Sequence, residues 1–232
     1  MLNSTPRLST VRIALIGVPL LALALSACAR NKGELVVDDG VGVTALRSAC
    51  PAVGIPDYTG DVTLFSAPDR TDAGAIDVTA TMTNLRSTCD DRIPSNGGDA
   101  AKIYTVASFD VLASRTDVRG ARRVQLPYFS TVLRAGNNIV AKRVGTVTLD
   151  FADGQARASA HAQAGSYVDR AEATLSREIR DKLNRKRKAG DTDAAIDPLA
   201  QPEVRAAIAK ASFELLVGFA LDQKQFAYNV TR

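Results

Sequence analysis

The segment TVTLDFADGQARASAHAQA, residues 146–164, carries the clearest strand pattern in the chain. Before the Asp153-Gly154 pair, Val, Leu and Phe alternate with Thr and Asp, and after it alanine alternates with polar residues. Period-two alternation is typical of a strand with one buried face, and Asp-Gly is a turn sequence that hairpins prefer. The segment therefore predicts two strands joined by a tight turn. Its alanine face must be approached closely by a helix or an opposing sheet.

Similar patterns fill most of the chain between residues 43 and 164. Five further stretches read as strands because they are short, alternate in polarity or are rich in β-branched and aromatic residues. A hairpin turn is expected at residues 135–138, where the sequence is Ala-Gly-Asn-Asn. The five stretches are Asp61–Phe65, Ala75–Leu85, Lys102–Thr116, Val124–Arg134 and Ile139–Phe151.

After residue 164 the apolar residues no longer recur at every second position but at every third or fourth, as in a helix. Tyr167–Lys188 predicts a helix that Gly190 ends, and Pro202–Val217 predicts a second helix with Pro in its first turn. Gly218 is expected to break this helix. Apolar residues then alternate at Phe219 and Leu221 and again at Phe226, Tyr228 and Val230, which predicts one or two final strands.

Together these elements predict a mainly β fold with some α-helix. The expected architecture is an antiparallel β-sandwich of immunoglobulin or fibronectin type, with a two-helix insertion before the final strand. The comparison is architectural only, because the chain has no Trp and so lacks the Cys–Trp–Cys hallmark of true immunoglobulin domains.

The first 28 residues have the features of an export signal. Arg7 and Arg12 precede an apolar run, Ile13–Leu25, which ends in small residues. The run is shorter than the roughly 20 residues that a membrane-spanning helix needs. The four residues Leu25-Ser26-Ala27-Cys28 resemble the lipobox of bacterial lipoproteins.

This resemblance implies that the signal is cut before Cys28, that the Cys28 sulfur carries diacylglycerol and that the new amino terminus is acylated. Ala29, rather than Asp, follows the cysteine, which implies the periplasmic face of the outer membrane. The alternative is an ordinary signal peptide with a chance cysteine near its cut site. The lipid would be the only covalent anchor of the mature chain.

The expected organisation is a signal peptide over residues 1–27, a tether over 28–42 and one domain over 43–232. Gly and charged residues in the tether segment are typical of a solvated linker. Removal of residues 1–27 discards two arginines and no acidic residue, so the formal charge falls from +4 to +2. The basic character of the whole chain is therefore weak evidence for a nucleic-acid partner.

Two cysteines remain besides Cys28. In an exported protein, Cys50 and Cys89 predict one disulfide, because such chains mature in an oxidising compartment. The alternative is two independent buried thiols.

Few residues suit catalysis or metal binding. His161, the only histidine, lies on the polar face of its predicted strand, and a hydrolase would require Ser159, His161 and an Asp to converge. One His and two bonded Cys cannot supply an ordinary zinc site. Asp191, Asp193 and Asp197 are better explained by loop solvation or helix capping. The sequence therefore predicts no enzyme activity, no metal and no cofactor.

The most distinctive charged feature is Arg185-Lys186-Arg187-Lys188, at the end of the first predicted helix. These cations either complement the helix dipole at a solvated end or contact anionic headgroups or an acidic envelope protein. Nucleic acid is not expected, since no aromatic residues are interleaved for base stacking.

The sequence thus predicts a lipid-anchored lipoprotein of the bacterial envelope. It would act as a non-enzymatic interaction or scaffold module of an outer-membrane or periplasmic assembly. The alternatives are a periplasmic binder or carrier of a small apolar ligand and, third, an envelope hydrolase. Neither the oligomeric state nor the partner follows from the sequence.

Overall fold

The computed structural model describes residues 48–91, 101–185 and 196–232, all of which belong to one compact unit, Ala45–Arg232. The signal peptide, Cys28 and the tether predicted over 28–42 lie outside the described residues, as do Lys186, Arg187 and Lys188. The elements follow in the order β1 (Ala52–Gly54), β2 (Asp61–Phe65), η1 (Ala73–Ala75), β3 (Ile76–Asp90), β4 (Lys102–Arg115), β5 (Arg122–Arg134), β6 (Asn138–Phe151), β7 (Arg157–Asp169), α1 (Arg170–Ala173), α2 (Arg177–Asn184), η2 (Pro198–Ala200), α3 (Pro202–Lys210), β8 (Phe213–Phe219) and α4 (Gln223–Thr231).

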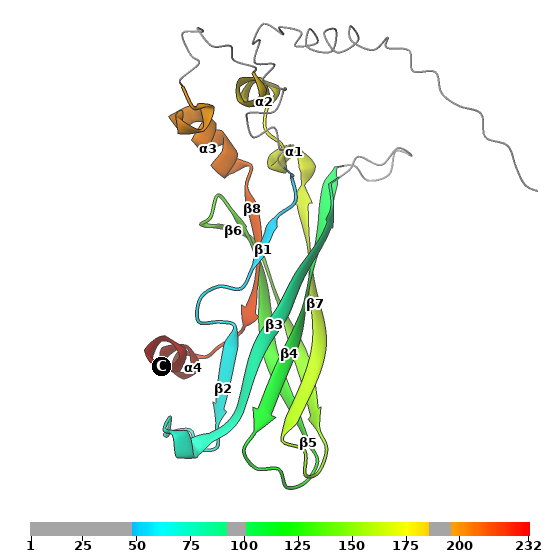
Figure 1. The fold of residues 1–232 in the computed structure, drawn as a ribbon, viewed down its shortest axis with the longest axis vertical. Coiled ribbons are helices and arrows are strands. Elements are labelled where there is room, and N and C mark those ends of the chain that lie inside the picture. The colour runs from blue at the N-terminus through cyan, green and yellow to red at the C-terminus, as the bar shows by residue number, and fades with distance from the viewer. Residues whose placement is uncertain (1–47, 92–100, 186–195) are drawn as a thin grey trace, which may run out of the picture. The chain divides into compact units, whose positions relative to one another are not determined.

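Two four-stranded sheets dominate this unit (Figure 1). One has the strand order β1-β8-β5-β6 and the other β2-β3-β4-β7. All neighbouring strands run antiparallel except β1 and β8, which pair in parallel. The expectation of a mainly β protein with antiparallel-rich sheets is thus confirmed.

Two turns with similar sequence signals connect strands in different ways. The turn after Arg134 joins β5 to β6 as a hairpin, as expected. The Asp153-Gly154 turn exists, but β6 and β7 belong to different sheets, so the expected hairpin is wrong. The β4–β5 connection holds this turn instead, because the Gly154 N–H donates to the Val118 carbonyl and the Asp153 carboxylate accepts from the Gly120 N–H.

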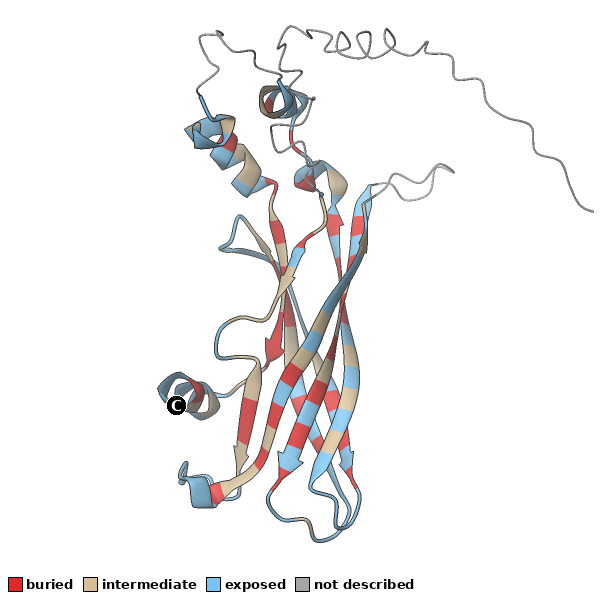
Figure 2. Ribbon diagram, viewed as in Figure 1, coloured by how far each residue is buried: buried red, intermediate tan, exposed pale blue. Residues whose placement is uncertain are grey.

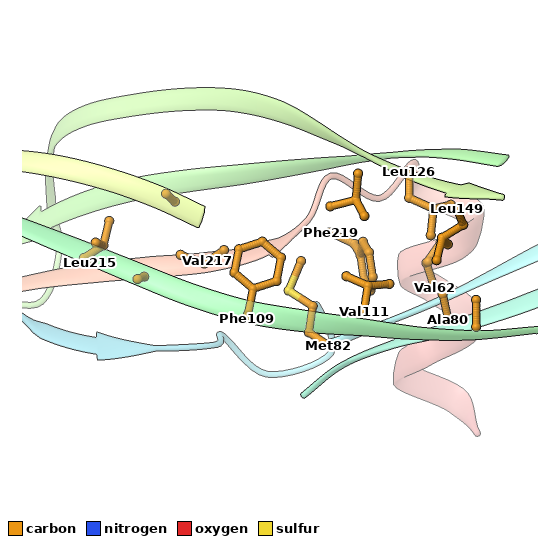
Figure 3. Packing of buried hydrophobic residues seen from close by; sticks show 14 of the residues in the cluster. Val62, Ala80, Met82, Phe109, Val111, Leu126, Leu149, Leu215, Val217 and Phe219 are labelled. Atoms are coloured by element: carbon orange, nitrogen blue, oxygen red, sulfur yellow. The ribbon is translucent and has the colours of Figure 1, made fainter. Parts of the chain in front are cut away.

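The two sheets share one apolar core, part of which Figure 3 shows. Its largest fully buried side chains include Phe109 from β4, Phe151 from β6 and Phe219 from β8. Full burial of one such side chain contributes about 1.5–3 kcal/mol. The alternation predicted for β3 is also confirmed, since Val78, Ala80 and Met82 are all buried.

The alanine face of β7 is covered by the opposing sheet, one of the two possibilities that the sequence left open. Tyr128 of β5 donates its hydroxyl to the Gln163 carbonyl at 2.9 Å. Its ring lies edge-on to Phe109, with centroids 5.3 Å apart. Small side chains on β7 leave room for this large ring.

The helix expected over 167–188 is wrong in its first part. Strand β7 continues to Asp169, because residues 102–114 of β4 pair with its whole length. Two short helices follow, and the second begins anew where the Ser176 hydroxyl accepts from the Ile179 N–H. Such capping satisfies an amide that the first helical turn leaves unpaired.

The helix expected over 202–217 ends at Lys210, and the final strand lies elsewhere than expected. Residues 213–219 form β8, which pairs with β5 on one side and β1 on the other. The segment expected as a strand over 226–230 is part of helix α4, which starts with a capping box between Asp222 and Gln225. Gly218 does not break a helix but lies in β8, where a Cβ would overlap the Thr59 side chain.

Candidate functional site

A polar cluster lies on the outer face of the β2-β3-β4-β7 sheet. Phe109 and Val111 of β4 point into the core, so Asp110 between them points outward. His161 is directly opposite on β7, and its Nδ1 lies 2.9 Å from the Asp110 Oδ1. The sequence marked His161 as an exposed strand residue, and its partner was missed because their pairing depends on the β4–β7 register.

A β-bulge brings a third side chain into the cluster. The β3–β4 register shifts between Thr83 and Arg86, and Asn84 at this shift has a φ of 53°. Its amide donates to the Asp110 Oδ2 at 2.8 Å, and its carbonyl accepts from Arg86 Nε at 3.0 Å. Asn84 therefore does not share the inner face of β3 as the simple alternation suggested.

Two hydrogen bonds lower the pKa of the Asp110 carboxyl group. The bond from His161, and then that from Asn84, holds the pKa of Asp110 below its ordinary value. Both carboxylate oxygens are thereby engaged. Asp110 is suited to orienting the imidazole as a fixed anion and not to exchanging protons near neutral pH.

Ser159 stands next to this pair on the same face of β7 but does not complete a catalytic triad. It pairs with Leu112, and same-face neighbours on a strand have Cα atoms about 6.6 Å apart. Among residues 48–91, 101–185 and 196–232, no hydrogen bond joins Ser159 to His161. Asp110 and His161 thus meet, whereas Ser159 lines a neighbouring hollow.

This open hollow, of about 560 Å³, occupies the same sheet face. Its lining combines hydroxyl groups with short apolar side chains and one arginine. The lining residues are Thr79, Thr81, Thr83, Leu112, Ala113, Ser114, Gln155, Arg157, Ala158 and Ser159.

Metal binding finds no support in the described part of the chain, where no three His, Cys, Asp or Glu side chains gather. Asp191 and Asp193 lie outside it. Asp197 caps η2, because its carboxylate accepts from the Leu199 N–H. The sequence suggested loop solvation or capping of the helix that starts at Pro202, whereas Asp197 caps the short helix before it.

The predicted disulfide is confirmed. Cys50 and Cys89 are bonded, with their Cα atoms 6.1 Å apart. The bridge ties the segment before β1 to the end of β3, and so links one sheet to the other. The Asp91 carboxylate supports this junction by accepting from the Ser48 hydroxyl at 2.8 Å and the Ala49 N–H at 3.2 Å.

Of the predicted basic run, only Arg185 is described, just after helix α2. Two cations earlier in α2, Arg177 and Lys182, have acidic partners. Lys182 Nζ lies 2.8 Å from Glu203 and 3.3 Å from Glu178, and these two carboxylates raise the pKa of Lys182. These ion pairs compensate much of the positive charge of the helix itself.

A second exposed feature, the hairpin arm, was not singled out from the sequence. We define it as residues 135–144, the β5–β6 turn and the first half of β6. Every residue of the arm is exposed, including Ile139, Val140 and Val144 (Figure 2). The available signal was the absence of any Asp or Glu from 122 to 149, together with apolar residues beside Lys142 and Arg143.

Comparison with known proteins finds no matching protein family, no matching curated protein and no matching solved structure. Among the helices that the structure describes, none combines the length and apolar character needed to cross a membrane. Functional inference therefore depends on the residues themselves.

Proposed function

We propose that the protein is a lipid-anchored lipoprotein of the bacterial envelope, held through Cys28 at the periplasmic face of the outer membrane. In this proposal it is a non-enzymatic interaction or scaffold module of an outer-membrane or periplasmic assembly. The observation that carries the proposal is the Cys50–Cys89 disulfide. It uses two of the three cysteines, leaves Cys28 for the lipid and fits maturation in an oxidising compartment.

The finer fold assignment belongs to the same proposal. A β-sandwich of immunoglobulin or fibronectin type is supported by two four-stranded sheets that share one core. The helices between β7 and β8 would be an insertion into this sandwich.

The interaction role is supported by aromatic side chains on the outer face of the β2-β3-β4-β7 sheet. Tyr104 and Tyr167 are both exposed and lie opposite each other, with ring centroids 4.6 Å apart. Exposed tyrosines are favoured in protein interfaces, because they combine a large apolar surface with a hydrogen-bonding hydroxyl. A carrier of an apolar ligand has less support, since large side chains such as Phe109, Phe151 and Phe219 fill the space between the sheets.

The deciding experiment is the intact mass of the protein isolated from membranes, with and without Cys28→Ser. Loss of residues 1–27 together with added acyl chains, both abolished by the substitution, is the expected result. Crosslinking in intact cells would then identify the assembly, and Tyr104→Ser with Tyr167→Ser should weaken the crosslinks. A cleaved protein without lipid in the soluble fraction would contradict the anchor. A lipidated protein that crosslinks to nothing would contradict the interaction role.

A further inference from the structure

We propose that the hairpin arm docks on the anionic headgroup surface of the membrane to which the protein is tethered. Ile139, Val140 and Val144 would sit at the level of the headgroups, and Lys142 and Arg143 would contact lipid phosphates. The inference rests on the proposed function, because the lipid anchor is what keeps this end of the domain at the membrane.

The first argument is the exposure of the arm. Among the described strands, β6 has β5 as its only sheet neighbour, and residues 138–144 of β6 are all exposed. Ile139, Val140 and Val144 are 61 %, 46 % and 66 % exposed. Ile139 and Val144 pair with residues on one face of β5, and Val140 lies at the register shift between β5 and β6. The arm therefore presents exposed apolar side chains within a few residues, which is less common than single exposed ones.

The second argument is charge. Within the described residues, neither Lys142 nor Arg143 forms an ion pair, unlike Arg177 and Lys182 of α2. The nearby Arg134 is already paired with Glu172, at 3.2 Å. The acidic residue in register with the arm, Glu214, lies two strands away on β8. The arm therefore offers two free cations beside apolar side chains, the composition of a surface that binds anionic lipid.

The third argument is the position of the tether. The strand registers place Ala52, Glu214, Leu133 and Ile139 in one row across the β1-β8-β5-β6 sheet. Strands lie about 4.8 Å apart, so Ala52 and Ile139 are separated by roughly 15 Å. The chain that leads back to Cys28 thus joins the domain at the same end of the sheet as the arm. Twenty positions separate Cys28 from Ser48, and a tether of that length with random-coil dimensions would span roughly 25 Å, short enough to keep this end near an anchored lipid.

A second copy of the chain is a poorer occupant of the arm. Two copies paired edge to edge through β6 would bring the Lys142 and Arg143 of one copy against those of the other. Cations on an edge strand are a recognised device against such pairing. An acidic envelope protein has the required charge, and the experiment below separates it from lipid.

The experiment uses the whole protein as cells process it, purified in detergent and reconstituted into vesicles. Val140→Cys is labelled with an environment-sensitive fluorophore, and Arg119→Cys, in the β4–β5 connection at the other end of β5, is the matched control. Nitroxide-labelled lipids report contact as quenching. We expect quenching at residue 140 on vesicles rich in phosphatidylglycerol, little on phosphatidylcholine, and none at residue 119.

A pair of charge reversals tests the role of the cations. Lys142→Glu should lower the ratio of docked to free arm about tenfold or more. The substitution removes one cation and adds one anion, and each such charge changes binding to an anionic surface roughly fivefold. Arg157→Glu makes the same charge change on β7, outside the arm, and should leave the ratio unchanged.

The outcomes separate the inference from the proposed function. Acyl chains on the protein with no quenching at residue 140 would leave the anchor in place and overturn docking of the arm. Absence of acyl chains would overturn the anchor. In that case, docking would still be supported if the unlipidated protein floated with the anionic vesicles, and overturned if it did not. Shielding of residue 140 only after an envelope protein is added would replace lipid by an acidic protein partner and overturn the inference.

Discussion

Loss of the Cys50–Cys89 disulfide should lower the free energy of unfolding by about 4 kcal/mol. The bridge spans 39 residues and ties the start of the domain to the far end of β3. In the chain-entropy description, a crosslink of this length removes about 13 cal/mol/K from the unfolded chain, which is about 4 kcal/mol at 25 °C. The Asp91 hydrogen bonds to Ser48 and Ala49 remain in the variant, but each contributes only about 1 kcal/mol.

Urea unfolding of the Cys50→Ala/Cys89→Ala variant, followed by circular dichroism, measures this loss. The wild-type protein under reducing conditions should match the variant, and the variant itself should be insensitive to reductant. Amide hydrogen exchange in β1 should also become faster, because Cys50 lies two residues before that strand. A loss below about 1 kcal/mol would refute the reasoning, since it would mean that the unfolded chain gains little freedom when the bridge is absent.

Three further predictions concern the core, one close contact and the polar cluster. Phe109→Ala should cost about 3–5 kcal/mol in urea unfolding, because it empties a fully buried site between the sheets. Gly218→Ala should cost about 1–3 kcal/mol, because its Cβ would overlap the β1–β2 connection. His161→Gln should raise the pKa of Asp110 toward its ordinary value of about 4, as read by carboxyl NMR. Because folding depresses this pKa, the carboxylate stabilises the fold above its unfolded pKa and loses that contribution as the pH falls through the folded pKa.

Each of these changes has a matched control in the same part of the fold. Leu112→Ala removes an exposed side chain from the same strand and should change stability by less than about 0.5 kcal/mol. At Gly54 in β1, an added Cβ meets only ordinary contacts, so Gly54→Ala should be nearly neutral. Ser159→Ala should leave the pKa of Asp110 unchanged, because no hydrogen bond among the described residues joins Ser159 to Asp110 or to His161. Equal effects in a variant and its control would contradict the corresponding explanation.

Strands with strict alternation could be predicted because their signal is local. Val78, Ala80 and Met82 alternate with threonines, and the structure buries all three. The Cys50–Cys89 pair could likewise be predicted from cysteine count and compartment. These inferences hold without knowledge of which strand lies beside which.

Short segments with mixed signals were predicted less well. Residues 213–217 continue the apolar spacing of the preceding helix, yet they form a strand because β5 and β1 supply backbone partners on both sides. Helix α4 was missed although its Asp222–Gln225 capping box is readable from the sequence, because alternation over 226–230 was given more weight. Tertiary pairing outweighs helical propensity where both are weak.

The candidate functional residues also divide into those with a local signal and those that depend on strand pairing. Cys28 and the basic run could be identified from linear motifs, and both remain predictions. The Asp110–His161 pair and the Asn84 bulge required the β3–β4–β7 register, since the residues involved are up to 77 positions apart in the chain. The exposure of the hairpin arm depends on which part of β6 the opposing sheet covers, and no local sequence pattern encodes that.

The sequence by itself determined the strand-rich class, the β5–β6 hairpin and the disulfide, because alternation, turn residues and cysteine count act over short distances or depend on composition. Only the tertiary structure decided that β6 and β7 separate into two sheets, that β8 is a strand and that the start of β1 lies at the same end of its sheet as an exposed arm. The physical reason is that strand pairing is a long-range choice. Its free energy depends on which backbone groups and side chains from distant segments meet, and this information is absent from any single stretch of the chain.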